Sequence, residues 1–438
     1  MNTLLSCASI LWITTMALVS PLSAQTEPEL SKELPWFVEK MEPPILPEIL
    51  VGRDWMVHHL ESAGVVAVDI RPISMYDAGH LPGAVRVELP PEPSSLDGIR
   101  ALLSQAGLRG SEVLVLYGGA QDRSAIGLAF LSLSALGWDN VKVLDIGFET
   151  WARAQLPISK DRSLRQSVPL ALPPSPHSPF VTREEMIASF GRKGYEILDL
   201  RDKGGWGTGY TAPAGFAAGH IPHALPFDVQ TLLPATGWPD PAQARGLLMA
   251  LGPRASEHVQ PNATFLLYGE GPTDPALGLG FLLLHILGAP ARVFSPGFLG
   301  WTKEASDPVV RIVPAEEVQA LLAREQSGSK PAGLRDELPK SFILLDLRED
   351  WDYNDGHIPG ALSLPEHLFA ERFDSVLHEH WPKADPAVTP LILYCYGRDC
   401  IRSRNCATLA AQRGFRKLLW LREGMSAWEA IDPEPAAR

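Results

Sequence analysis

The sequence predicts an α/β protein made of three similar domains, each a parallel sheet with helices on both faces. Short apolar segments typical of buried strands alternate with amphipathic segments typical of helices, which is the pattern of a helix-covered parallel sheet. The same order of elements occurs three times along 438 residues, a length too great for one core of ordinary size. We therefore expect tandem domains rather than a single sheet.

The first repeat sets the order of the elements. Its expected strands lie at 65–69 (VVAVD), 113–117 (VLVLY) and 141–144. Its expected helices lie at 49–62 and 124–136, and Gly137 should end the second of them. The loop at 118–123 joins the second strand to this helix.

The second and third repeats return to this order after a linker at 157–180 that is rich in Pro and Ser. The expected strands are 196–200, 264–268 and 292–294, then 342–346, 391–394 and 417–421. The expected helices include 276–287 and 403–413, the latter closed by Gly414. Parallel sheets bind ligands at the carboxyl ends of their strands, so the loop after 391–394 is a candidate site.

We place the three domains at 49–156, 178–305 and 310–432. Residues 1–24 are apolar and uncharged, end in small residues and resemble a secretory signal peptide, and residues 25–48 form a tether rich in Pro and Glu. A periplasmic or secreted protein is expected. An uncleaved membrane anchor is the alternative, because the apolar run approaches the length of a membrane span.

The net charge of −13 argues against a nucleic-acid partner. Beyond the leader, no stretch is long and apolar enough to predict a membrane span. Three cysteines lie beyond the leader, all in one loop and helix, so they do not form a disulfide framework. No His or fourth Cys stands at zinc-ligand spacing, so we expect no metal and no cofactor.

The loop at 395–402 comes after the strand LILY and precedes a helix. A cysteine at this position is favoured as a thiolate by free loop N–H groups and by the positive end of the helix dipole. We therefore expect Cys395 to be the nucleophile and the more acidic thiol, and Cys400 to titrate nearer to a free thiol. Arg398, Arg402 and Arg404 add positive charge that would draw in an anion.

The motifs in this order resemble the rhodanese (thiosulfate sulfurtransferase) domain family. The shared features are an Asp-x-Arg strand end, a Gly-His-Ile-Pro-Gly-Ala turn, a strand with a cysteine loop and a helix after it, and a terminal Gly-x-x-x-Trp. The resemblance covers three tandem copies. It implies that Cys395 attacks the outer sulfur of a small anionic donor, forms a persulfide and passes the sulfur to a thiol or cyanide.

The resemblance also implies a set of binding residues. Loop amides stabilise the persulfide in the manner of an oxyanion hole, and Arg402 and Ser403 match the Arg-Ser that closes such loops. The implied substrate-binding residues are Tyr396, Gly397, Arg398, Asp399, Cys400, Ile401, Arg402 and Ser403. Cys400 is in addition a possible resolving thiol, a disulfide partner of Cys395 or an inert loop residue, whereas Cys406 is expected in the core.

Two departures from the family pattern keep other functions open. Gly118 and Gly269 stand where the first and second repeats would carry the nucleophile, so only the third repeat is expected to be catalytic; the first loop, with Arg123, could still bind an anion. The loop between Cys395 and Arg402 is longer than in typical sulfurtransferases, which favours phosphate or arsenate chemistry as an alternative. Two further alternatives are a redox role of Cys395 and Cys400 and a binding scaffold that recruits a protein partner through the first two domains.

Several recurrent residues are expected to be structural. His80, His220 and His357 occur in turns of repeats with and without the cysteine. The strand-end Asp residues and the terminal Trp residues recur in the same way, which favours turn anchoring and packing. These are Asp69, Asp199 and Asp346, and Trp151, Trp301 and Trp428.

Overall fold

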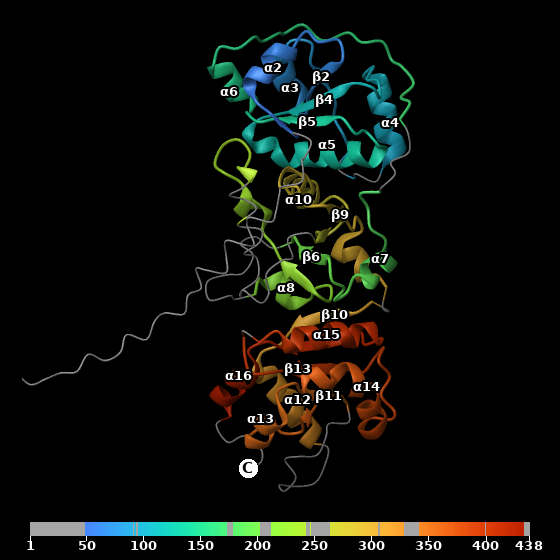
Figure 1. Ribbon diagram of the computed structural model, residues 1–438, viewed down its shortest axis with the longest axis vertical. Helices are drawn as coiled ribbons and strands as arrows, with labels where there is room; N and C mark the ends of the chain where they lie inside the picture. Colours follow the sequence, from blue (N-terminus) through green and yellow to red (C-terminus); the bar gives the residue numbers. More distant parts are fainter. Residues whose placement is uncertain are drawn as a thin grey trace, which may run out of the picture. The chain divides into compact units, whose positions relative to one another are not determined.

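The computed structural model (Figure 1) describes residues 49–432 apart from 91, 93, 94, 173–177, 202–211, 242–245, 247–262, 305, 306, 328–340 and 399. The described residues belong to one compact unit. The expected leader and tether lie outside the described residues. Within this unit the chain builds three parallel sheets, here called sheets I, II and III.

Sheet I is formed by five strands in the order β1-β5-β4-β2-β3. They are β1 (Leu50–Val51), β2 (Val65–Asp69), β3 (Val85–Arg86), β4 (Val113–Tyr117) and β5 (Val141–Leu144). Its helices are α2 (Arg53–His59), α3 (Ile73–Ala78), α4 (Leu96–Gln105), the short η1 (Ala120–Asp122), α5 (Arg123–Leu136) and α6 (Phe148–Arg153). The central pair β2 and β4 runs in register from Val65 opposite Val113 to Asp69 opposite Tyr117.

Sheet II has four described strands in the order β7-β6-β8-β9. They are β6 (Tyr195–Asp199), β7 (Ala224–Pro226), β8 (Thr264–Tyr268) and β9 (Ala291–Val293). Its helices are α7 (Arg183–Ala188), α8 (Ala214–Ala218), η3 (Val229–Leu232), α10 (Pro275–Ile286) and α11 (Gly297–Trp301).

Sheet III repeats the order of sheet I as β10-β14-β13-β11-β12. Its strands are β10 (Val309–Ile312), β11 (Ile343–Asp346), β12 (Leu362–Ser363), β13 (Leu391–Tyr394) and β14 (Lys417–Leu421). Its helices are α12 (Ala315–Ser327), α13 (Asp350–Asp355), α14 (Glu366–His380), α15 (Arg402–Gln412) and α16 (Gly424–Ile431). The predicted α/β class with parallel, helix-covered sheets is confirmed.

Most predicted strands have the predicted bounds, and the differences are local. The segment expected as one helix at 49–62 first forms strand β1 beside β5 and only then helix α2, because Leu50 and Val51 pair with Val143 and Leu144. Gly137 and Gly414 lie just beyond α5 and α15 with φ of 85° and 95°, the left-handed conformation that ends a helix.

The strand-end Asp residues anchor the sheets, as expected. In sheet III, Asp346 accepts hydrogen bonds from Arg348 at 2.7 Å and from the hydroxyl of Tyr394 at 2.7 Å, and Arg348 also donates to Gly356 O at 2.6 Å. The same network joins Asp69, Arg71 and Tyr117 in sheet I and Asp199, Arg201 and Tyr268 in sheet II. Buried groups bonded in this way fix the strand ends to the Gly-His turns.

The Gly-His turns are structural in the same sense. His80 stacks on Tyr76, His220 on Phe216, and His357 on Tyr353, each with ring centroids less than about 4 Å apart. Each imidazole Nδ1 lies within hydrogen-bond distance of the carbonyl of the residue on which it stacks. Trp151, Trp301 and Trp428 are fully buried.

Helices α5 and α10 pack against each other through glycine, which joins the elements around sheet I to those around sheet II. A Cβ on Gly127 would lie 2.6 Å from the backbone carbon of Gly278, closer than a side-chain carbon can come. The two backbones are therefore in direct contact, which explains why the two helices have glycine at the same place.

We predict that Gly127→Ala destabilises the protein by about 1–3 kcal/mol, because the added methyl group must push the two helices apart. Urea unfolding measured by circular dichroism reports this loss. Gly98→Ala is the matched control: Gly98 is exposed on α4, its Cβ would meet Ser95 Oγ at 3.4 Å, and alanine there should be neutral or slightly stabilising. Equal effects of the two substitutions would contradict the backbone contact.

Candidate functional site

Cys395 comes directly after β13, at the carboxyl end of the central strand of sheet III. Its side chain is fully buried, and Met425 N donates to its carbonyl at 2.9 Å. The Cys395 Sγ lies 3.4 Å from the carbonyl oxygen of Cys400 and 3.3 Å from Ser403 Oγ. The buried Tyr394 network just before it holds the strand end, so the position of the sulfur is set by the sheet.

Ser403 links this sulfur to the core. Its hydroxyl accepts a hydrogen bond from Trp420 Nε1 at 2.8 Å, which uses one of its lone pairs. The hydroxyl keeps its single proton, so Ser403 can donate a hydrogen bond to Cys395 Sγ when this sulfur is a thiolate. Ser403 is fully buried in the first turn of α15, so this donor is held in place.

The two loop thiols have opposite pKa shifts. Burial, together with the neighbouring Cys400, raises the pKa of Cys395 well above its usual value. The hydrogen bond with Cys395 lowers the pKa of Cys400 to about 6 against the cost of burial, helped by hydrogen bonds with the backbone of Arg402 and Tyr396 and by the charge of Arg402. The expectation that Cys395 is the more acidic thiol is therefore wrong in this geometry.

The opposite shifts follow from the surroundings of each sulfur. Cys395 Sγ is buried and donates to the Cys400 carbonyl oxygen at 3.4 Å, so burial keeps its proton in place, while the nearby Cys395 side chain and the charge of Arg402 favour the thiolate of Cys400. The charge rests mainly on Cys400, which is half-buried, while Cys395 is closed off from solvent. The pair therefore supplies one thiolate at neutral pH. Burial also raises the pKa of Cys406, which is a core residue as expected.

The arginines of the loop contact protein groups. Arg402 Nη1 donates to Glu349 Oε1 at 2.7 Å, and its guanidinium lies over the Tyr396 ring at 5.4 Å. Arg398 donates to Glu423 at 2.8 Å, and Arg404 donates to the His223 carbonyl at 2.8 Å. The interpretation of Arg404 as an anion contact of the loop is wrong, since its guanidinium reaches the elements around sheet II.

The other predicted binding residues form the wall of the loop. The half-exposed Tyr396 donates from its hydroxyl to Asp352 at 2.6 Å, and Cys400 N donates to Gly397 O at 2.9 Å. Ile401 N-caps α15, and Asp399 lies outside the described residues. The Cys400 amide is thus committed to the loop's own turn and does not point at a substrate.

Sequence reasoning missed the residues that neutralise and close this loop. Glu349, Asp352 and Glu423 supply carboxylates to Arg402, Tyr396 and Arg398, and Trp420 fixes Ser403. Gly424, with φ of 59°, lies so close that a Cβ would stand 2.7 Å from Gly397 N. The Gly-x-x-x-Trp motif in the sequence pointed to Gly424. No sequence pattern pointed to the three carboxylates.

The corresponding loops of sheets I and II are closed by their own carboxylates. Asp122 Oδ2 accepts from Gly119 N at 2.7 Å, and Asp274 Oδ2 accepts from Glu270 N at 2.8 Å. A Cβ on Gly118 would lie 2.8 Å from Asp122 Cβ, and one on Gly269 would lie 2.7 Å from Asp274 Cγ. These carboxylates take the space that a nucleophile would need.

Whether the first loop binds an anion near Arg123 stays a prediction, and the contacts of this arginine do not favour it. Arg123 donates to the carbonyls of Pro234 and Ala235, at 3.0 and 3.1 Å. A cavity of about 420 Å³ beside this loop is lined by Gly118, Arg123 and Glu149 and by Trp238 from the elements around sheet II. The carboxylates of Asp145 and Glu149, which also line it, make this cavity unfavourable for an anion.

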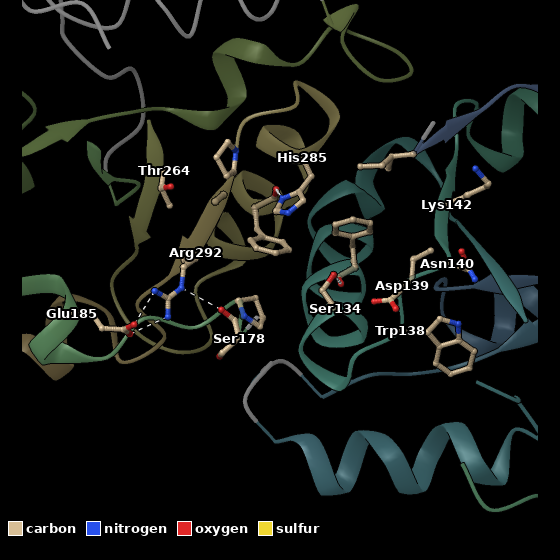
Figure 2. A pocket seen from close by; sticks show the side chains of 17 residues that line it. Ser134, Trp138, Asp139, Asn140, Lys142, Ser178, Glu185, Thr264, His285 and Arg292 are labelled. Carbon is tan, nitrogen blue, oxygen red and sulfur yellow. Dashed lines mark hydrogen bonds and ion pairs between the residues drawn. The ribbon is translucent and has the colours of Figure 1, made fainter. Parts of the chain in front are cut away.

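A larger cavity, of about 810 Å³, lies between α5 and α10 and away from the cysteine loop (Figure 2). Ser134 and Trp138 line one side, and Arg292, bonded to Glu185 at 2.9 Å, lines the other. His285 Nδ1 donates to Phe281 O at 2.8 Å, and burial lowers the pKa of His285. No cysteine is among the residues that line this cavity.

The described part of the chain lacks a group of metal ligands and a membrane-spanning helix. Among those residues, no three His, Cys, Asp or Glu side chains gather into a group that could hold a metal ion. The helices that the structure describes are too short or too polar to cross a bilayer.

We predict that reduced protein is alkylated by iodoacetamide first at Cys400, with a half-maximal rate near pH 6, and at Cys395 only at alkaline pH. Ser403→Ala should move the Cys395 step to still higher pH, because the thiolate loses its hydroxyl donor. Site-resolved mass spectrometry measures both steps, and buried Cys406 is the internal control. Alkylation of Cys395 below the pH at which Cys400 reacts would contradict the assignment.

Comparison with known proteins agrees with this geometry. A family model described as "Rhodanese-like domain" matches residues 53–154 and 330–431. A putative thiosulfate sulfurtransferase of Saccharopolyspora erythraea is 28% identical over 193 residues, which are 41% of this chain and 68% of that protein. Putative thiosulfate sulfurtransferase SseA of Mycobacterium tuberculosis is 23% identical over 287 residues, or 60% of this chain and 91% of that protein.

Among solved structures, the chain is similar to the 3-mercaptopyruvate sulfotransferase SseA from Escherichia coli. The likeness covers 57% of this chain and 98% of that chain, with a TM-score of 0.44 and 18% identity. The family model does not match residues 178–305, so the interpretation of sheet II as a third copy stays a prediction. The two matched segments hold most of the strands of sheets I and III, and these parts of the chain are similar to rhodanese-like domains.

Proposed function

We propose that the protein is a sulfurtransferase that moves sulfane sulfur from thiosulfate or a similar small anionic donor to a thiol or cyanide through a persulfide on Cys395. The observation that carries the proposal is the position of Cys395 directly after β13, with a hydroxyl donor, Ser403 Oγ, held by Trp420 at 3.3 Å from its sulfur. The rhodanese-like match at 330–431 and the sulfurtransferase relatives support it.

The chemistry has two steps. With a proton on Cys400, the Cys395 thiolate attacks the outer sulfur of thiosulfate; the S–S bond of the donor breaks and sulfite leaves with the electron pair. An acceptor thiolate or cyanide then attacks the outer sulfur of the persulfide and returns Cys395 as a thiolate. Donation by Ser403 stabilises the anionic sulfur at both stages. Because Cys395 is buried, the donor can reach it only after the loop shifts.

A redox role of the pair is the second candidate, favoured by the closeness of the two residues: Cys395 Sγ lies 3.4 Å from the carbonyl oxygen of Cys400. In that reaction the Cys400 thiolate attacks Cys395 Sγ of the persulfide. A Cys395–Cys400 disulfide forms, and hydrosulfide leaves with the electron pair. A second thiol is needed to reduce the disulfide before another turnover.

The remaining alternatives have less support. Phosphate or arsenate chemistry needs free positive charge over the loop, whereas Arg402 and Arg398 are paired with Glu349 and Glu423. A binding scaffold built on sheets I and II fits the carboxylate-closed loops at Gly118 and Gly269, which have no nucleophile. We keep this as a role beside catalysis and not in place of it.

We further propose the domain limits 49–156, 178–305 and 310–432, with only the third domain catalytic, and a periplasmic or secreted location. The carboxylate-closed loops support the first part. The apolar leader in the sequence supports the second.

We predict that thiosulfate treatment of the reduced protein adds one sulfur atom, and that the sulfur maps to Cys395. Cys395→Ser should abolish the addition, while Cys400→Ser should keep it but slow it, since the pair then lacks its second sulfur. Intact-mass and peptide mass spectrometry measure this, and the same spectra show whether residues 1–24 have been removed from protein recovered from its natural host. Sulfur on Cys400 of the Cys395→Ser variant, with turnover retained, would contradict the proposal.

A further inference from the structure

Helix α15 carries a polar stripe that contacts the elements around sheet II. Arg404, Thr408 and Gln412 are spaced by four residues and so lie on one face of the helix. Arg404 Nη2 donates to His223 O at 2.8 Å, and Gln412 Nε2 donates to Phe190 O at 2.7 Å. All three side chains belong to the helix that comes after the cysteine loop, and the acceptors belong to the elements of another sheet.

The opposite face of α15 packs into the core of sheet III. Ser403, Cys406, Ala407 and Ala410 are buried there, and Ser403 lies 3.3 Å from Cys395 Sγ. The helix is therefore held from both sides. A shift of α15 relative to the elements around sheet II would move Ser403 relative to the sulfur, because the hydroxyl and the polar stripe are parts of one rigid helix.

His223, whose carbonyl accepts the hydrogen bond from Arg404, has an unusual backbone conformation. His223 has φ of 70°, and the described residues include only one other non-glycine residue, Gln155, at positive φ. The equivalent turns of the other two repeats have Gly83 and Gly360 there, with φ of 73° and 79°. A histidine in the left-handed region costs conformational energy that glycine avoids, and such strain persists where the surroundings hold it.

The His223 side chain is part of the contact. Its Nδ1 lies 3.5 Å from Thr408 Oγ1, and Thr408 Oγ1 donates to Arg404 O at 3.1 Å. Burial and the charge of Arg404 lower the pKa of His223 to about 3, so the imidazole is neutral and adds no charge beside Arg404. The strained turn thus offers both its carbonyl and its ring to one face of α15.

A second contact leads from the same turn to the hydroxyl of Ser403. His220 and Val310 exchange backbone hydrogen bonds at 2.9 and 3.0 Å, which joins the Gly-His turn to strand β10. The His220 ring lies edge-on to Trp420 at 6.5 Å, and Trp420 donates to Ser403. Two adjacent parts of one turn therefore face the two groups that place Ser403: helix α15 and Trp420.

We propose that the turn bearing His220 and His223 is a positioning element for the thiol pair, and that Arg404 is the residue through which it holds α15. The elements around sheet II, which have no nucleophile at Gly269, then serve the reaction of sheet III by fixing where Ser403 meets Cys395. The kinetic part of this inference rests on the proposed sulfur transfer; the effect on the thiols does not.

The test compares variants of the full chain. Arg404→Ala removes the hydrogen bond to His223 O, and Arg404→Lys keeps the positive charge and an N–H donor. Arg413→Ala is the matched control, because Arg413 lies at the end of the same helix and donates to a backbone carbonyl, Ala370 O at 2.6 Å, within the elements of sheet III. His223→Gly keeps the turn and its carbonyl, relieves the strained φ and removes only the ring.

Two readouts are measured on each variant: the pH profile of iodoacetamide alkylation at Cys395 and Cys400, and kcat and KM with thiosulfate and cyanide. For Arg404→Ala we expect both thiol steps to move to higher pH and kcat to fall about 10-fold to 100-fold, as for a misplaced catalytic group, with KM nearly unchanged. Arg404→Lys should restore most of the loss. His223→Gly should shift the profile in the same direction but less, and Arg413→Ala should match the unaltered protein.

Unchanged alkylation profiles in Arg404→Ala and His223→Gly would overturn the positioning role, whatever the turnover. An equal shift in Arg413→Ala would also overturn it, since any loss of an arginine from α15 would then suffice. If the profiles shift as expected while the unaltered protein shows no sulfur transfer, the proposed reaction fails and the positioning role stands. Circular dichroism on every variant separates these outcomes from misfolding, and Arg404→Lys and His223→Gly keep the test decisive if Arg404→Ala does not fold.

Discussion

The buried hydrogen-bond network at the end of each sheet is the constraint on which the rest of the structure depends. In sheet III one carboxylate, Asp346, accepts from both Arg348 and Tyr394, and Tyr394 O in turn accepts from Leu347 N. Removing one partner would leave a buried charge unpaired, which is costly. The network therefore fixes the last residue of β13, and the next residue along the chain is Cys395.

The side chains just beyond this anchor decide whether a loop can do chemistry. In sheet III the loop closes around Cys395, whose sulfur lies 3.4 Å from the Cys400 carbonyl oxygen, and Trp420 holds the Ser403 hydroxyl against that sulfur. In sheets I and II the same space is taken by Asp122 and Asp274. The central strands follow the same order in all three sheets, so the loops differ mainly in a few side chains at one edge.

The sequence was sufficient for the fold because strands such as 113–117 and 391–394 are continuous apolar runs bounded by glycine and charged residues. It was also sufficient for the position of Cys395, since a cysteine directly after a buried strand lies at the ligand-binding edge. It failed on β1, whose two residues form a strand only through pairing with β5. A contact of that kind leaves no local pattern.

The site shows the same limit. Positive charge near the loop was visible in the sequence, but the partners of that charge were not, because Glu349 lies 53 residues from Arg402 and His223 lies 181 residues from Arg404. The acidity of the two thiols was misjudged for a related reason. Loop amides and a helix dipole favour a thiolate at either cysteine, and only the burial of Cys395 and its hydrogen bond to Cys400 decide which one carries the charge.

The central claim is that Cys395 and Cys400 form one unit with a single thiolate at neutral pH. The most direct measurement is a spectroscopic titration of thiolate absorbance on reduced protein, with the Cys395→Ser/Cys400→Ser double variant subtracted. We predict one thiolate per chain, appearing near pH 6, and no second one until strongly alkaline pH. Two thiolates that appear together near the ordinary thiol pKa of about 8.5 would contradict the claim.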